Sequence, residues 1–145
     1  MAYTTQANLQ SRWPALVFWT DDDASGTVDS AITTAAIAAA DAKIDLAASQ
    51  HYATPLGLTD AVTETVIAEL SNTLAGHVLA ERTNDMASLE AMTDSYAEAV
   101  KYLSQLSSGK VSLRGETQAS QQLPSGDLVM YGDTSPVTRT NMWGL

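Results

Sequence analysis

Apolar residues recur at helical spacing over residues 1–109, and this pattern predicts a body of five helices. Turn-forming and capping residues separate the apolar segments, and alanine, the strongest helix former, dominates the third of them. Three of the helices are long, so we expect a mainly α fold built as a small antiparallel helical bundle. The expected helices run from about Thr5 to Arg12, Pro14 to Trp19, Val28 to Ser49, Asp60 to Arg82 and Asp85 to Leu106.

The same pattern predicts which side chains form the core and where the helices begin and end. In the second helix, the apolar run from Leu16 to Trp19 predicts a buried turn. In the fourth, apolar residues at every fourth position predict one buried stripe. These stripe residues are Val62, Val66, Leu70, Leu74 and Val78. The expected N-caps are Thr4 or Thr5, Thr27 or Asp29, and Thr59 or Asp60, and Gly109 is expected to end the last helix in a left-handed conformation.

The chain changes character after Gly109, where Ser, Thr, Gly, Pro and Gln replace the alanine-rich pattern. We therefore divide it into a helical bundle body, residues 1–109, which holds the core, and an extended C-terminal tail or arm, residues 110–145. Two stretches of the tail, residues 110–116 and 128–131, predict one or two short strands.

The tail carries more large apolar side chains than a solvated chain segment usually does. Trp, Tyr and Met are enriched in the cores of protein interfaces. Either the tail folds back over its own bundle, or it binds another subunit or partner by groove insertion or strand addition. The candidate partner-binding residues are Leu128, Val129, Met130, Tyr131, Met142, Trp143 and Leu145.

Composition narrows the classes of function. The 145 residues include 7 Lys and Arg against 17 Asp and Glu, for a net charge of −10. This balance argues against a general grip on nucleic acid and against docking on an anionic membrane. The chain has no Cys, which excludes disulfides and thiolate zinc sites. No membrane-spanning run and no signal-peptide pattern is evident, so we expect a soluble protein made in the cytoplasm.

The acidic loop before the third helix allows two interpretations. Asp21, Asp23 and Asp29 fall at ligand positions of a calcium loop, and Gly26 falls at its sharp turn. Ile32, however, stands where that loop needs its bidentate acid. The loss of two ligand oxygens favours an Asp-rich turn that begins the next helix. A cation held by the three aspartates is the alternative.

No catalytic or cofactor-binding constellation is evident, so we expect no enzyme, no cofactor and no metal. His51 and His77 lack partners at ligand spacing, and we expect a connector residue and a half-exposed helix residue. The chain contains no nucleophile elbow, phosphate loop or dinucleotide fingerprint. Several acids are expected to form a solvated face or a surface for a basic partner: Glu64, Glu69, Glu81, Glu90, Asp94 and Glu98.

Four stretches of the chain, in their order and spacing, resemble a Mu-like phage protein family, a conserved domain without an assigned function. That family is similar to the head–tail connector, or neck adaptor, proteins of tailed phages. The stretches are AYTTQANLQSRW, WTDDDASGTVDSAI, AAADAKIDLAASQHYATPL and SSGKVSL. The resemblance covers about residues 1–115.

The resemblance implies a structural protein of the virion neck. Connectors of this kind form a homo-oligomeric ring of about twelve subunits below the portal protein, line the DNA channel and dock the next neck or tail-completion protein. DNA passes without specific binding, which suits an acidic wall. The C-terminal segment of such proteins reaches the portal or a neighbouring subunit. The alternatives are another neck protein, either a head-closure or a tail-terminator protein and usually richer in β structure, or a small calcium-responsive binding module.

Overall fold

The fold is mainly α, as the sequence predicts. A computed structural model describes residues 1–119 of the chain, and the statements below concern those residues. The helices are α1 (Gln6–Arg12), α2 (Leu16–Thr20), α3 (Ser30–Ala48), α4 (Ala61–Arg82), α5 (Met86–Ala91) and α6 (Thr93–Ser107).

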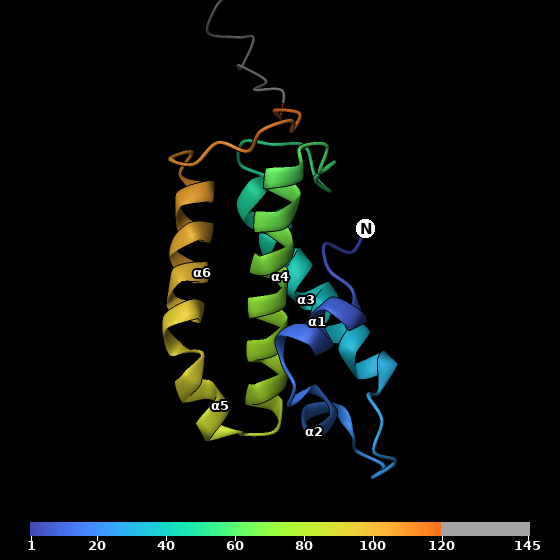
Figure 1. Ribbon diagram of the computed structural model, residues 1–145. Helices are drawn as coiled ribbons and strands as arrows, with labels where there is room; N and C mark the ends of the chain where they lie inside the picture. The colour runs from blue at the N-terminus through green and yellow to red at the C-terminus, as the bar shows by residue number, and fades with distance from the viewer. Residues whose placement is uncertain (120–145) are drawn as a thin grey trace, which may run out of the picture.

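The three longest helices form an antiparallel bundle. In Figure 1, α3 and α6 run upward and α4 runs downward beside them, while α1 and α2 lie against the lower half of α4 on the side away from α6. The core lies where α3, α4 and α6 meet, and it extends beneath α1 and α2 through Leu9, Leu16 and Trp19. The predicted small antiparallel helical bundle is thus confirmed.

Local capping signals set most of the helix boundaries. The side chains of Thr5, Asp29, Asp60 and Asp85 each accept a hydrogen bond from a free backbone N–H in the first turn of the following helix. At the C-terminal end of α6, Gly109 has φ +72° and ends the helix. The N–H groups of Gly109 and the next residue donate to carbonyl oxygens of the last turn of α6, at 3.2 and 2.9 Å.

The prediction of one helix from about Asp85 to Leu106 is wrong, because the structure has two helices there, α5 and α6. The chain leaves helical geometry at Met92, with φ −96° and ψ 3°, between α5 and α6. The Met92 side chain is buried at 1% exposure. The break therefore turns the chain so that α6 lies along α3 and α4 while Met92 enters the core.

The predicted stripe on α4 is wrong at its first two positions. Val62 is 63% exposed and Val66 is 38% exposed, whereas Ile67, Leu70 and Leu74 are buried. A step of four residues turns an α-helix by about 400°, so a strict four-residue repeat drifts by about 40° at each step. The buried face follows mixed steps of three and four instead.

The predicted burial of the second helix is half right. Leu16 and Trp19 are buried, three residues apart on one face of α2, but Phe18 is 69% exposed. A single helical turn presents only one face to α4, so the residue beside Trp19 points away from the bundle.

The short strand expected at residues 110–116 does not form. Within the described part of the chain, β pairing is limited to one isolated antiparallel bridge between Tyr52 and Gln118. Residues 110–119 instead cross the upper end of the bundle in Figure 1. The core also continues past Gly109, because Leu113 is buried at 7% exposure beneath this crossing. The second expected strand, residues 128–131, lies outside the described residues.

Candidate subunit and partner interface

The seven candidate partner-binding residues of the tail all lie outside the described residues. They are Leu128, Val129, Met130, Tyr131, Met142, Trp143 and Leu145. What the structure does describe is the root of the tail and the surfaces of the body that surround it.

The root of the tail is fastened to the connector between α3 and α4. The Glu116 carboxylate accepts hydrogen bonds from the backbone N–H of Gly57 at 2.8 Å and of Leu58 at 2.7 Å. The backbone N–H of Leu113 donates to the Tyr52 hydroxyl at 2.9 Å, in a buried position. Each of these bonds joins residues more than fifty positions apart, so they hold the segment against the body.

Backbone hydrogen bonds continue this attachment to the last described residue. The Ala53 N–H donates to the Thr117 carbonyl at 2.8 Å, and the Ala119 N–H donates to the His51 carbonyl at 2.9 Å. The His51 ring nitrogen Nε2 lies 3.1 Å from the Ser107 carbonyl at the end of α6. The tail therefore departs from the end of the bundle at which both α3 and α6 end.

An apolar groove of about 680 Å³ lies between α3 and α6 next to this point, and we call it the α3–α6 groove. Leu46 on α3 is 71% exposed and Val100 on α6 is 45% exposed, and both line it. Leu74 of α4 forms part of its floor, at 1% exposure. The other lining residues are Lys43, Ala47, Gln50, Tyr96, Leu103, Ser104 and Ser107. Exposed apolar side chains around a hollow are typical of an interaction site.

A second exposed apolar group lies on the opposite side of α4. Phe18 of α2 is 69% exposed, and it is followed by the acidic loop that begins at Asp21. Arg82 at the end of α4 forms an ion pair with Asp22 of this loop and donates to the Trp19 carbonyl at 3.1 Å. This flank thus combines an apolar side chain with a loop of mostly acidic charge.

The acidic loop has the geometry of a turn. Both carboxylate oxygens of Asp21 accept from the chain itself, from the N–H of Ser25 at 2.8 Å and of Gly26 at 2.9 Å. Asp29 caps α3 through the N–H of Ala31 at 2.8 Å. Hydrogen bonds from Ser25 are the main cause that lowers the pKa of Asp23. These contacts match the Asp-rich turn that the sequence favours.

The histidines and the exposed acids lie where the sequence places them. His51 lies in the connector, and His77 is partly buried on α4, stacked on the Tyr96 ring at 3.7 Å between centroids. The acids expected on a solvated face are exposed: Glu64, Glu69, Glu81, Glu90, Asp94 and Glu98. Across residues 1–119, no three His, Asp or Glu side chains are grouped so that they could hold a metal ion.

Sequence reasoning did not find the buried polar network around Asp41. The two carboxylate oxygens of Asp41 accept from the N–H of Tyr3 at 3.0 Å and from Ser71 Oγ at 2.6 Å. The Thr4 hydroxyl donates to the Asn72 side chain at 2.7 Å. The only signal was an acid between Ile37 and Ile44 on the apolar face of α3, and the partners of that acid come from distant segments.

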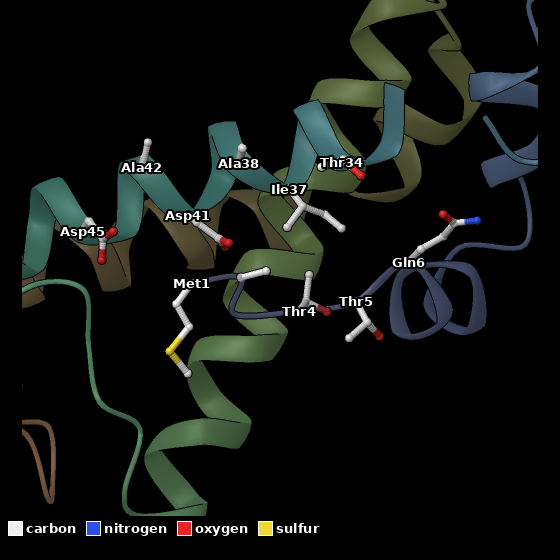
Figure 2. Close-up of a pocket in the computed structure, with 11 residues that line it drawn as sticks. Met1, Thr4, Thr5, Gln6, Thr34, Ile37, Ala38, Asp41, Ala42 and Asp45 are labelled. Carbon is white, nitrogen blue, oxygen red and sulfur yellow. The ribbon is translucent and has the colours of Figure 1, made fainter. Parts of the chain in front are cut away.

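Tyr3 links this network to the α3–α4 connector. Its hydroxyl donates to Asp45 and accepts from the buried backbone N–H of Leu56 at 2.9 Å. Burial, followed by the hydrogen bond to Asp45, raises the pKa of Tyr3 above its usual range. Figure 2 shows the Asp41 side chain directed toward the N-terminal segment, with a hollow of about 490 Å³ between that segment and α3. The network holds the N-terminal segment in place.

Comparison with known proteins adds a family match. The family model described as Bacteriophage Mu, Gp36 matches residues 3–131, which include all the helices from α1 to α6 and the first apolar stretch of the tail. No curated protein matches the chain. Among the helices described here, none combines the length and apolar character needed to cross a membrane.

Proposed function

The chain belongs to the bacteriophage Mu Gp36 family, and from this premise we propose that it is a structural protein of the virion neck, the head–tail connector. In this role, copies of the chain form a ring of about twelve subunits below the portal protein. The ring lines the DNA channel and docks the next neck or tail-completion protein. The proposal extends the phage origin given by the family match to a specific position in the particle.

The observation that carries the proposal is the placement of exposed apolar groups on two different flanks of the body. Phe18 lies on α2, which packs against α1 and α4, whereas Leu46 and Val100 line the groove between α3 and α6. Figure 1 shows α2 and α6 on opposite sides of α4. A ring requires two different surfaces on each subunit, because each copy contacts one neighbour with one surface and the other neighbour with the other.

The negative charge of the chain supports a position around DNA without binding to it. The net charge is −10, and the acids of α4, α5 and α6 named above are exposed. A wall of carboxylates repels phosphate, so DNA slides along it. We expect that Gln or Asn at the channel-facing acids slows DNA passage, measured as the rate of DNA ejection from particles. An unchanged rate would remove this part of the proposal.

The fold also supports a connector over the other neck proteins considered. Head-closure and tail-terminator proteins are expected to be richer in β structure, whereas the described part of this chain is helical with one isolated bridge. A calcium titration by calorimetry tests the remaining alternative, and heat that is lost in Asp21→Asn would favour a calcium-responsive module.

The experiment that tests the proposal is inactivation of this gene in the phage that carries it, followed by electron microscopy of the lysate. We expect DNA-filled heads and finished tails that have not joined, and we expect the wild-type gene supplied in trans to restore complete particles. In restored particles, a tagged copy of the chain should label a ring between portal and tail. Label elsewhere in the particle, or normal joining without the protein, would overturn the proposal.

A further inference from the structure

We propose that the α3–α6 groove of one subunit binds residues 128–131 of a neighbouring subunit. This inference rests on the proposed ring and names the contact that links its copies. It also gives the apolar part of the tail a defined binding site on the body of the same protein.

The groove suits an apolar segment with acidic neighbours. Leu46 and Val100 expose apolar surface at its edges, above the buried floor at Leu74. No carboxylate lines the groove, although the chain has 17 acids, and Lys43 is the one charged residue in the lining. Within residues 1–119, Lys43 has no ion-pair partner. The groove therefore offers apolar contact together with one uncompensated positive charge.

The tail contains a segment with the matching chemistry. Residues 128–131 read Leu-Val-Met-Tyr, and Asp127 and Asp133 stand on either side of them. Four extended residues span about 13 Å. On one side of the groove, the lining residues run from Lys43 on α3 to Gln50, two residues past the end of that helix, and this stretch covers about 10 Å. The apolar segment and this stretch of the groove are thus similar in length. Depending on the direction of the segment in the groove, either Asp127 or Asp133 can approach Lys43.

The position of the tail root makes this contact reachable. Ala119 is fastened to His51, next to Gln50 and Ser107, which line the groove. Eight residues separate Ala119 from Leu128, and eight extended residues reach about 28 Å. One helix with its side chains is about 10 Å across, so a bundle two helices wide is about 20 Å across, and a tail of this length reaches the groove of an adjacent bundle.

The family match distinguishes this segment from the other apolar part of the tail. The match ends at Tyr131, so it includes residues 128–131 and excludes Met142, Trp143 and Leu145. We therefore assign the groove to the first segment, and the second is left for a partner outside the ring.

Cysteine cross-linking of full-length chains tests this contact without a background, because the chain has no Cys. One chain carries Leu46→Cys and a second, of different size through a tag, carries Met130→Cys. After mixing and mild oxidation, we expect a disulfide-linked heterodimer as the main product. The matched control replaces Leu46→Cys by Thr65→Cys, at an exposed position of α4, and should give little heterodimer.

Two further variants make the outcome decisive. Lys43→Glu in the Leu46→Cys chain should lower the heterodimer yield several-fold, and Asp127→Lys with Asp133→Lys in the Met130→Cys chain should restore it. A heterodimer yield no higher than that of the Thr65→Cys control overturns the inference. A chain with both Leu46→Cys and Met130→Cys that cross-links only within itself, as a faster-migrating monomer, also overturns it.

The cross-linking experiment and the labelling of particles can fail independently of each other. Label at the neck without cross-linking between residues 46 and 130 removes the groove contact and leaves the connector role. Efficient cross-linking between chains, with label elsewhere in the particle, keeps the groove contact and removes the connector role.

Discussion

The indole N–H of Trp19 donates a hydrogen bond to the Asp85 carboxylate at 2.9 Å and so joins α2 to the beginning of α5. The same carboxylate caps α5 through the Ser88 N–H at 3.2 Å and accepts from the Ser88 hydroxyl at 2.6 Å. Hydrogen bonds from Ser88, and then the one from Trp19, lower the pKa of Asp85. One side chain therefore fixes both a helix start and a contact between distant segments.

The lowered pKa of Asp85 predicts a pH-dependent contribution to stability. A carboxyl group with a lowered pKa in the folded state stabilises the fold fully above its unfolded pKa, about 3.9 for Asp, and loses this effect as the pH falls through the folded pKa. We expect Asp85→Asn to be less stable than wild type at neutral pH, with a difference that shrinks below about pH 4. Urea unfolding across this range measures it. A difference that stays constant from neutral to acid pH would contradict the prediction.

Two adjacent aromatic residues should differ greatly in their effect on stability. Trp19 is 1% exposed and Phe18 is 69% exposed. Trp19→Ala removes a buried ring and its hydrogen bond, so we expect a loss of about 3–5 kcal/mol in the free energy of unfolding. Phe18→Ala should change it by less than about 0.5 kcal/mol. Urea unfolding followed by far-UV circular dichroism compares them, and similar losses would show that Phe18 is buried in solution.

Gly109 and Gly26 form a matched pair for backbone strain. Both have left-handed φ angles, +72° and +75°. A Cβ atom at Gly26 would meet nothing within 4 Å, whereas one at Gly109 would lie 3.0 Å from His51 Nε2. Each Ala substitution should cost about 1–2 kcal/mol of backbone energy. Gly109→Ala should cost more than Gly26→Ala, and His51→Ala should remove the excess. Equal losses measured by thermal unfolding would show that the His51 ring moves freely.

The Tyr3 hydroxyl should contribute to stability more than that of Tyr102. Tyr3→Phe leaves the buried N–H of Leu56 without its acceptor, which costs about 1–3 kcal/mol. The Tyr102 hydroxyl has no hydrogen-bond partner among residues 1–119, so Tyr102→Phe should change the free energy of unfolding by less than about 0.5 kcal/mol. The two variants are compared by urea unfolding. If Tyr3→Phe leaves the free energy of unfolding unchanged, water replaces the lost acceptor.

The position of truncation should decide whether the bundle stays stable. Deletion after Gly126 keeps every contact described here, so we expect the unfolding transition of the full chain. Deletion after Gly109 removes Leu113 from the core and Glu116 from the connector, and it should lower the midpoint of thermal unfolding. Equal midpoints for the two truncated chains would show that residues 110–119 do not stabilise the body.

Local signals explain what the sequence could predict. Asp29 and Asp60 cap helices, and Gly109 ends one, because each acts on backbone within a few residues of itself. The helix count of the bundle body and its antiparallel arrangement follow from such signals, apart from the break at Met92.

Features that depend on contacts between distant segments could not be predicted, because no residue near them in the sequence signals those contacts. Phe18 and Trp19 are equally apolar in sequence, and only the position of α4 decides which of them is buried. The partners of Asp41 come from the N-terminal segment and from α4. The α3–α6 groove exists only once two helices that are far apart in the chain lie side by side. Interfaces between subunits belong to this class.

The attachment of residues 113–119 determines where a mechanical load would enter the molecule. A pull on the chain beyond Ala119 acts first on its bond to His51 and on the bond between Ala53 and Thr117. Force therefore passes into the junction of α3 and α4, the two longest helices, before it reaches the end of α6. A load on the tail therefore does not unwind the helix that precedes it.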